Sequence, residues 1–341
     1  MPGGATLPIL YHMKTTLGVY LNINDRWQKE LAQLADQHPE LEIIGGKEAV
    51  IARIADIDLL IALPMPEDQL RRAVRLRALF VPFVGVDHLP RQLLLDRGVR
   101  VFNVHGNAEA VAERALALAL ASLGRVVEFH NDLCGRHEWH GFWARGGVQD
   151  GWDSLYRKRC TIFGTGAIGR ELASLLHAFG CHVTGYRRRA ERGVPEGFDS
   201  VAPTLAEAIA AGELLFIALP LTPETEGIFG EAELQAAQGK LIVNVGRGEL
   251  IQERPLYEAL RDGVLRGAAL DVWFSYPADG ESCHSPSELG IHTLPNVVCS
   301  PHVGGFTPSA LTANQIETVA TVRDFLDGRP PRNECDLNLL Y

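Results

Sequence analysis

The sequence lacks an excess of positive charge and has no long apolar run. Its 341 residues contain 32 Lys and Arg against 42 Asp and Glu, a net charge of −10, so there is no general basic field to attract nucleic acid or an acidic membrane surface. No stretch approaches the roughly 18 apolar residues of a membrane span, and the start MPGGATLPILYHMK lacks the charged beginning and apolar run of a signal peptide. We therefore expect a cytoplasmic protein with no nucleic-acid or membrane partner.

Cysteine is also scarce, and its positions follow no pattern. Closely spaced CxxC pairs, which are typical of zinc sites and redox centres, are absent. We expect reduced thiols and no metal site. The six cysteines are Cys134, Cys160, Cys181, Cys283, Cys299 and Cys335.

What is present is an alternation of short apolar runs with segments of helical period. The length exceeds what one hydrophobic core usually serves, so we expect two domains. In the first part, the runs LPILYHM, DLLIAL, ALFVPFV and VRVFNV alternate with predicted helices over 27–37, 67–75 and 90–97. Six further runs follow from Arg159 onward. This rhythm predicts an α/β protein with two doubly wound parallel sheets, and a final helix over 308–326 that returns to the first domain.

Two segments between these series differ from the rest. Residues 108–131 have Ala and Leu on nearly every face of a predicted helix, so we expect this helix to be buried almost all round, between domains or against a second subunit. Residues 136–152 are irregular and aromatic, which indicates an arm. The apolar helix suggests a homodimer, because it needs a second surface to bury against.

The run CTIF leads into Gly164-Thr165-Gly166-Ala167-Ile168-Gly169 and then into a helix, the context that a dinucleotide-binding turn requires. Gly164 permits the tight turn, Gly166 lets the backbone approach a pyrophosphate, and Gly169 lets helix and strand pack closely. The alternative is a glycine-rich turn without chemical meaning.

The next strand ends in CHVTGYRRR, where an acidic residue normally binds the ribose of NAD. Arg187, Arg188 and Arg189 stand there instead, and guanidinium groups bind phosphate oxygens in a forked geometry. We therefore expect NADP as the coenzyme, with NAD as the alternative. A solvated basic turn is the other interpretation.

Three later strands end in Gly246-Arg247-Gly248, in DVWFSYP and in the segment from Ser300 to Gly305, and strand ends of this kind converge on one crevice. With these residues, the segments GTGAIG, ALPLTPETEGIF, NVGRGELI, GAALDV and SPHVGG resemble the D-isomer-specific 2-hydroxyacid dehydrogenase family over residues 80–307. The resemblance implies a Rossmann coenzyme domain, 105–303, inserted in a flavodoxin-like substrate domain, 1–104 plus 304–341. It also implies a homodimer and hydride transfer between a nicotinamide and C2 of a 2-oxo or 2-hydroxy acid.

The resemblance implies a role for each matching residue. Arg247 should bind the substrate carboxylate and stabilise the developing alkoxide, and His302 should act as general acid. Val84 and Gly85 should present amides to the carboxylate, with Asn107 bracing the hinge. Each residue also has a structural alternative. Taken alone, Arg247 could form a surface ion pair and His302 could be a structural histidine. Asp271 fits a strand-end cap as well as a coenzyme contact. The coenzyme contacts implied are Gly164, Gly166, Ala167, Ile168, Gly169, Arg187, Arg188, Arg189, Leu219, Pro220, Thr225, Val245, Gly246, Asp271, His302 and Gly304.

One residue departs from the family pattern. Tyr276 stands where family members usually carry a Glu that keeps the catalytic His protonated, so we expect an acid-shifted pH optimum for reduction. Glu281, or a negative group on the substrate, is an alternative source of that charge. The leading function is an NADPH-preferring reductase of small 2-oxo acids, such as glyoxylate or hydroxypyruvate. The alternatives are a dehydrogenase of a small anion such as formate or phosphite, and a non-catalytic nucleotide sensor.

Overall fold

The computed structural model describes residues 14–339, and within it the chain forms two compact units. One unit contains the chain up to Val104 and again from Thr312, and the other is His105–Leu311. The second boundary lies at 311/312, whereas the sequence suggested 303/304. Gly304 N donates to Asp271 at 2.8 Å and Gly305 packs closely on Asn107, which attaches this stretch to the second unit. The run LPILYHM, residues 7–13, lies outside the described residues.

The first unit is a five-stranded parallel sheet in the order β2-β1-β3-β4-β5, with helices on both faces. Leu59 and Ile61 of one strand pack with α1 and the final helix, whereas Leu60 and Ala62 face α2, α3 and α4, because successive side chains of a strand point to opposite faces. Val319 and Val322 of the final helix lie in this core, as the sequence predicted. The elements are β1 Thr15–Tyr20, α1 Asp25–Gln37, β2 Leu41–Gly45, α2 Lys47–Ala52, β3 Leu59–Ala62, α3 Glu67–Arg72, β4 Ala78–Phe80, α4 Arg91–Asp96, β5 Arg100–Phe102 and α11 Pro308–Leu326.

Local sequence explains where α1 begins and which face it buries. The side chain of Asn24 accepts a hydrogen bond from Trp27 N at 3.0 Å, which caps α1. Trp27, Leu31 and Leu34 then recur at intervals of three and four residues and form the buried face of the helix.

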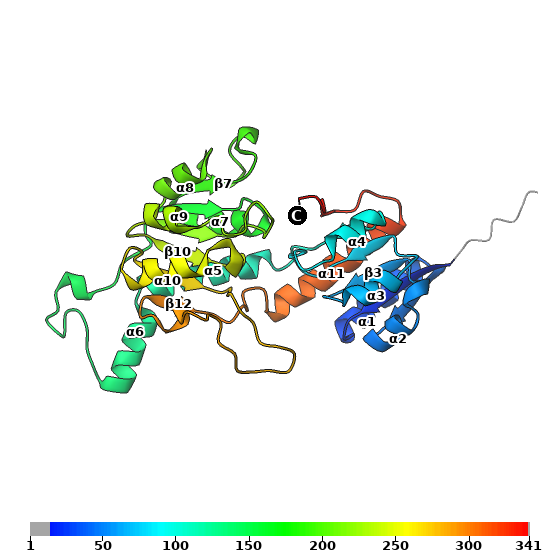
Figure 1. Ribbon diagram of the computed structural model, residues 1–341, viewed down its shortest axis with the longest axis horizontal. Coiled ribbons are helices and arrows are strands. Elements are labelled where there is room, and N and C mark those ends of the chain that lie inside the picture. Colours follow the sequence, from blue (N-terminus) through cyan, green and yellow to red (C-terminus); the bar gives the residue numbers. More distant parts are fainter. Residues whose placement is uncertain (1–13, 340–341) are drawn as a thin grey trace, which may run out of the picture. The chain divides into compact units, whose positions relative to one another are not determined.

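The second unit is a seven-stranded parallel sheet in the order β12-β11-β10-β9-β6-β7-β8 (Figure 1). Leu214 and Phe216 face α5 and α7, whereas Leu215 and Ile217 face α8, α9 and α10, so the sheet is covered on both sides. This is the doubly wound α/β unit that the sequence predicted, with one short strand, β8, that the pattern did not show. The elements are α5 Ala108–Leu123, α6 Val126–Asn131, β6 Arg159–Phe163, α7 Ala167–Ala178, β7 His182–Tyr186, β8 Ser200–Ala202, α8 Leu205–Ala211, β9 Leu214–Ile217, α9 Glu231–Ala236, β10 Leu241–Asn244, α10 Glu253–Arg261, β11 Gly267–Leu270 and β12 Val297–Cys299.

The single helix expected over 108–131 is wrong, because the chain breaks after α5. Gly124 ends α5, and Arg125 adopts a left-handed conformation with φ of 48° before α6 begins. α5 buries one stripe of Ala, Val and Leu and α6 buries no residue within the chain, and burial of this stretch against a second subunit stays a prediction. Between residues 14 and 339, no helix combines the length and apolar character needed to cross a bilayer.

Candidate active site

The glycine turn after β6 has the geometry that a dinucleotide needs. Gly164 has φ of 108°, and a Cβ there would lie 2.5 Å from Ala218 O, so only glycine fits. A Cβ on Gly169 would collide with Gly164 O, so this glycine sets the close approach of α7 to the turn. Gly166 caps α7, and a Cβ there would meet no atom within 4 Å, so its backbone is open to a ligand. The turn and the free amides of Ala167 and Ile168 therefore fit a pyrophosphate.

Two neighbouring loops follow β9 and β10 at the same edge of the sheet. Thr225 Oγ1 donates to Pro220 O at 2.7 Å and accepts from Thr222 N at 2.8 Å, which fixes the loop after β9. A Cβ on Gly246 would lie 2.9 Å from Leu219 O, so the two loops pack closely. Val245 N donates to Ile217 O at 3.0 Å and extends the sheet by one bond. These positions are those the family resemblance assigned to the coenzyme, and their contact with it stays a prediction.

Three arginines follow β7 at the position where a carboxylate is expected. Arg187 Nη2 donates to Gly193 O at 2.6 Å, while its Nε is buried and has no hydrogen-bond partner among residues 14–339. Arg188 forms an ion pair with Glu224 at 3.0 Å, and Arg189 is exposed. A buried donor without a partner costs free energy, so Arg187 carries an unsatisfied nitrogen at this strand end.

Arg247 is fixed by the backbone that carries it. Asn244 Nδ2 donates to Arg247 O at 2.8 Å, and Asn244 Oδ1 accepts from Gly246 N at 3.0 Å. Gly248 packs so closely on Trp273 O that no side chain would fit. The half-buried guanidinium therefore stands on a rigid strand end. Asn244 was missed at the sequence level, although its place at the end of β10 and the start of NVGRG is a signal for such a brace.

Asp271 organises the loop that carries His302. This carboxylate is 2% exposed and accepts hydrogen bonds from Ser300 Oγ, from Val303 N at 3.2 Å and from Gly304 N at 2.8 Å. His302 lies between these anchors in a left-handed conformation with φ of 57°, a conformation that a histidine adopts only where its surroundings hold it. These bonds match the strand-end cap interpretation of Asp271, and its contact with coenzyme stays a prediction.

Tyr276 lies beside the candidate general acid. Its ring centroid is 5.4 Å from that of His302, with the planes at 50°. Its hydroxyl accepts a hydrogen bond from Trp273 N at 3.0 Å. Burial raises the pKa of Tyr276, an effect opposed by the Trp273 hydrogen bond and by the charge of Arg247, so the phenol stays neutral. Arg247, His302 and Tyr276 thus lie around one neighbourhood at the carboxyl ends of β10, β11 and β12, which are adjacent strands.

Glu281, the alternative source of negative charge, is engaged in its own loop. Its carboxylate accepts from Ala278 N at 3.0 Å and lies 3.7 Å from His284 Nδ1. These contacts do not require His302, and compensation by Glu281 stays a prediction.

The remaining predicted substrate residues are distributed over both units. Val84 and Gly85 follow β4 in the first unit, where Val84 O accepts from Asn103 Nδ2 at 2.7 Å. Asn107 begins α5 in the second unit, packs on Gly305, and has a buried Oδ1 without a hydrogen-bond partner among the described residues. Their roles toward a substrate remain predictions.

Comparisons with known proteins agree with this geometry. Residues 116–304 match the sequence model of the D-isomer specific 2-hydroxyacid dehydrogenase, NAD binding domain. A glyoxylate/hydroxypyruvate reductase B of Pectobacterium atrosepticum is 34% identical over 86% of this chain and 89% of that protein. A D-3-phosphoglycerate dehydrogenase of Methanocaldococcus jannaschii is 28% identical over 92% of this chain, which spans 59% of that longer protein.

Solved structures share the fold across nearly the whole chain. The PH0520 protein of Pyrococcus horikoshii superposes with a TM-score of 0.77 at 27% identity, covering 95% of this chain and 96% of that one. The glycine turn, the Arg247 strand end and the Asp271-anchored His302 loop lie in or beside the matched segment. The chain therefore belongs to the D-isomer-specific 2-hydroxyacid dehydrogenase family of NAD(P)-dependent oxidoreductases.

Proposed function

We propose that this protein is an NADPH-preferring reductase that converts small 2-oxo acids, such as glyoxylate or hydroxypyruvate, into D-2-hydroxy acids. The observation that carries the coenzyme preference is the row Arg187, Arg188 and Arg189 at the end of a strand that lacks the acidic residue. The substrate class rests on the relative from Pectobacterium atrosepticum, whose name gives glyoxylate and hydroxypyruvate.

The arginine cluster favours the coenzyme that carries a 2′-phosphate. An acidic residue at this strand end would accept a hydrogen bond from the ribose hydroxyl of NAD and repel a phosphate. Arg187, Arg188 and Arg189 offer guanidinium donors there instead. A 2′-phosphate would accept charge-assisted hydrogen bonds from these guanidinium groups, so NADPH gains an interaction that NADH lacks.

Arg247 and His302 would supply substrate binding and proton transfer, respectively. The coenzyme, when bound, supplies the hydride that goes to C2 of the oxo acid. Arg247, fixed by Asn244, would bind the substrate carboxylate and draw electron density toward the oxo oxygen. His302 would donate a proton to that oxygen as the C=O double bond becomes a C–OH single bond. Its placement between the two anchors on Asp271 favours a constant ring position.

The test is a panel of 2-oxo acids assayed with NADPH and NADH. We expect kcat/KM to be higher with NADPH and with the smallest oxo acids, and Arg187→Gln to lower NADPH affinity about tenfold or more while changing NADH affinity little. Glu224→Gln is the matched opposite variant, because it removes the carboxylate that pairs with Arg188 and should tighten NADPH. Equal affinities for both coenzymes in the wild type would refute the preference. Tight coenzyme binding without turnover on any oxo acid would favour the sensor.

We also propose that the arm forms a contact with a second copy of the chain. Figure 1 shows residues 126–152 projecting from the body of the second unit. The arm and its base expose large apolar side chains that a monomer rarely leaves in water, including Phe142 at 85% and Trp143 at 75%. A homodimer would cover them, as in isologous assemblies generally. The other exposed apolar residues of the segment are Val126, Val127, Leu133, Trp139, Val148 and Trp152.

Light scattering coupled to size exclusion tests this contact. The wild type should elute as a dimer, and the pair of substitutions Phe142→Ser and Trp143→Ser should shift it toward the monomer. Val74→Ser, on an exposed position of the first unit, is the control for a simple loss of apolar surface. A monomeric wild type at micromolar concentration would contradict the proposal.

A further inference from the structure

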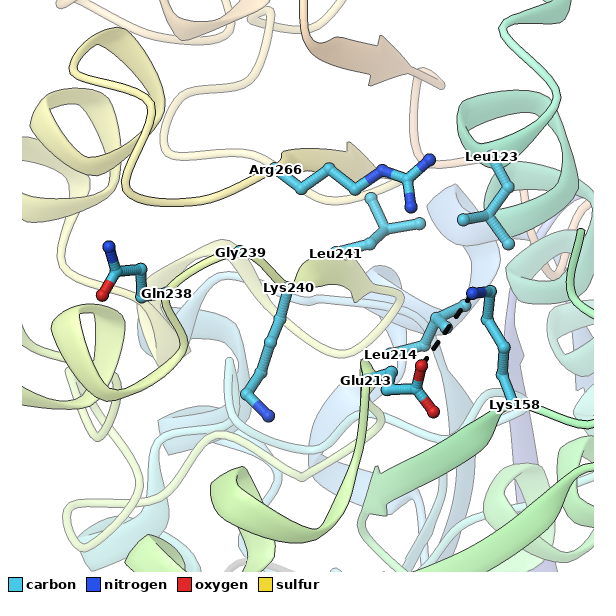
Figure 2. A pocket seen from close by; sticks show the side chains of 9 residues that line it. All are labelled: Leu123, Lys158, Glu213, Leu214, Gln238, Gly239, Lys240, Leu241 and Arg266. Carbon is cyan, nitrogen blue, oxygen red and sulfur yellow. Dashed lines mark ion pairs between the residues drawn. The ribbon is translucent and has the colours of Figure 1, made fainter. Parts of the chain in front are cut away.

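The seven-stranded sheet has a second charged site at its amino-terminal edge, opposite to the edge that carries Arg247 and His302. A cavity of about 240 Å³ opens there. Figure 2 shows its charged side chains arranged around Leu214 and Leu241. The residues that line it are Leu123, Lys158, Glu213, Leu214, Gln238, Gly239, Lys240, Leu241 and Arg266.

The position of the four charged residues follows from the topology. Lys158, Glu213, Lys240 and Arg266 each immediately precede a strand, namely β6, β9, β10 and β11. These four strands are consecutive neighbours in the sheet, in the order β11-β10-β9-β6. Because neighbouring strands lie about 4.8 Å apart, the four residues form a row across one edge. The row contains three cations and one carboxylate.

The neighbouring carboxylates do not balance these cations. Asp153 pairs with Lys158 at 3.0 Å and with Arg266, and Glu213 lies 3.9 Å from Lys158 and 3.4 Å from Arg159. Two carboxylates thus face four cations, a local excess of two positive charges in a chain whose net charge is −10. The four cations are Lys158, Arg159, Lys240 and Arg266.

Among the four cations, the charge of Lys240 is the least compensated by carboxylates. Its Nζ donates to a neutral acceptor, Gly212 O, at 2.5 Å, and no carboxylate of residues 14–339 lies within 4.0 Å of it. Burial lowers the pKa of Lys240, repulsion from Arg159 lowers it further, and Glu213 opposes these effects. A second anion close to this ammonium group would stabilise its charged form.

The choice of residue type supports a site for an anion. The chain contains only five lysines among its 32 Lys and Arg residues, and two of the five line this cavity. Lysine presents a compact charge with three rotatable donors, and arginine presents a planar fork, a combination that suits the tetrahedral oxygens of phosphate. Leu123, Leu214 and Leu241 provide an apolar wall for a short carbon chain.

We propose that this cavity binds a small phosphate-bearing anion, either inorganic phosphate or a short phosphate monoester, at a site separate from the coenzyme. A phosphate monoester carries about −1.5 to −2 charges at pH 7, which matches the local excess. The ligand would lie between Arg266, Lys158 and Lys240, with any carbon chain on the leucine wall. Glu213 opposes binding and limits its strength.

The lysines allow a test that distinguishes phosphate binding in this cavity from phosphate binding at the coenzyme site. The full chain, labelled with ¹³C at the lysine ε carbons, is titrated with inorganic phosphate and separately with glycerol 3-phosphate. The arginine cluster at 187–189 contains no lysine, so phosphate binding there moves no lysine signal. We expect saturable shifts of Lys158 and Lys240, with a dissociation constant in about the millimolar range or below. The signals of Lys29 and Lys47 should stay in place.

Two variants with opposite expected effects complete the test. Arg266→Gln should weaken phosphate binding about tenfold, since it removes one forked cation, and Glu213→Gln should tighten it severalfold, since it removes a repelling charge. Lys29→Gln, at an exposed position of α1 in the first unit, is the matched control, and thermal denaturation of each variant reports the folding of the second unit. Tighter binding of glycerol 3-phosphate than of phosphate identifies the ester as the ligand class, and the reverse identifies the free ion. Shifts that do not saturate, or equal affinities in Arg266→Gln and Glu213→Gln, would overturn the proposal.

Discussion

Tyr276→Glu places a carboxylate beside His302, the candidate general acid, where the family resemblance suggests a Glu, and its effect can be worked out from the structure. The ring of Tyr276 lies 5.4 Å from that of His302. A charge pair at about this distance interacts by about 3 kcal/mol at an effective dielectric constant of about 20 and by about 0.8 kcal/mol in water. These limits correspond to about 0.6 to 2 pH units. Because Tyr276 is 43% exposed, solvent screening favours the lower half of that range, about one unit.

The assay is the pH profile of kcat/KM for reduction of the best oxo acid. The carboxylate stabilises the imidazolium, so the basic limb, where His302 loses its proton, should move about one unit upward in Tyr276→Glu. Tyr276→Gln is the matched neutral control, and Tyr276→Phe removes only a neutral hydroxyl, so both should keep the limb of the wild type. Glu281→Gln should also keep it, because Glu281 binds within its own loop. If the profiles of the Glu and Gln variants superpose, the electrostatic reasoning is refuted.

Three further predictions concern the scaffold of the site and the arm. Asp271→Asn should lower the free energy of unfolding by about 2–4 kcal/mol, because a buried anion with three hydrogen bonds is lost, and thermal denaturation against Ser300→Ala measures it. Gly169→Ala should lower coenzyme affinity more than Ala167→Gly, measured by fluorescence titration, because the added Cβ meets Gly164 O; equal affinities would contradict the packing argument. His140 lies between Asp150 at 3.1 Å and Asp132 at 2.8 Å, and their hydrogen bonds, that of Asp150 foremost, raise its pKa. Because the pKa of His140 is raised, the stabilisation of the arm by protonated His140 is present at low pH and is lost as pH rises through the raised value, above about 6.5. The proposed dimer should therefore weaken over that range. In sedimentation measurements His140→Gln should remove the pH dependence.

The order of apolar runs and glycines was enough to predict much of this protein. The βα rhythm predicted two parallel sheets, because runs of four to six apolar residues without alternation occur where both faces of a strand are covered. Gly164 and Gly169 were recognisable for the same reason that they are needed, since each permits a close backbone approach that a Cβ would prevent, whereas Gly166 leaves the start of α7 open. The motifs around Arg247 and His302 likewise carried the family in their order and spacing.

The prediction failed where a local signal competed with tertiary contacts. Ala-rich and Leu-rich sequence over 108–131 favours an unbroken helix, yet the left-handed Arg125 ends it, because its guanidinium pairs with Glu128 and binds the carbonyls of Asp150 and Gly151 at the far end of the arm. Nothing in the local sequence shows that these carbonyls lie within reach.

The sequence by itself determined the fold class and the glycine turn, and it predicted the chemical types of the candidate catalytic side chains, since all of these follow from residue types and short spacings. Only the tertiary structure decided how Asp271 holds the His302 loop, and that the Tyr276 hydroxyl accepts a hydrogen bond from Trp273 N. It also decided that Lys158, Lys240 and Arg266 form one row. These residues are far apart in the chain, and the register of parallel strands, which no local pattern encodes, is what brings them together.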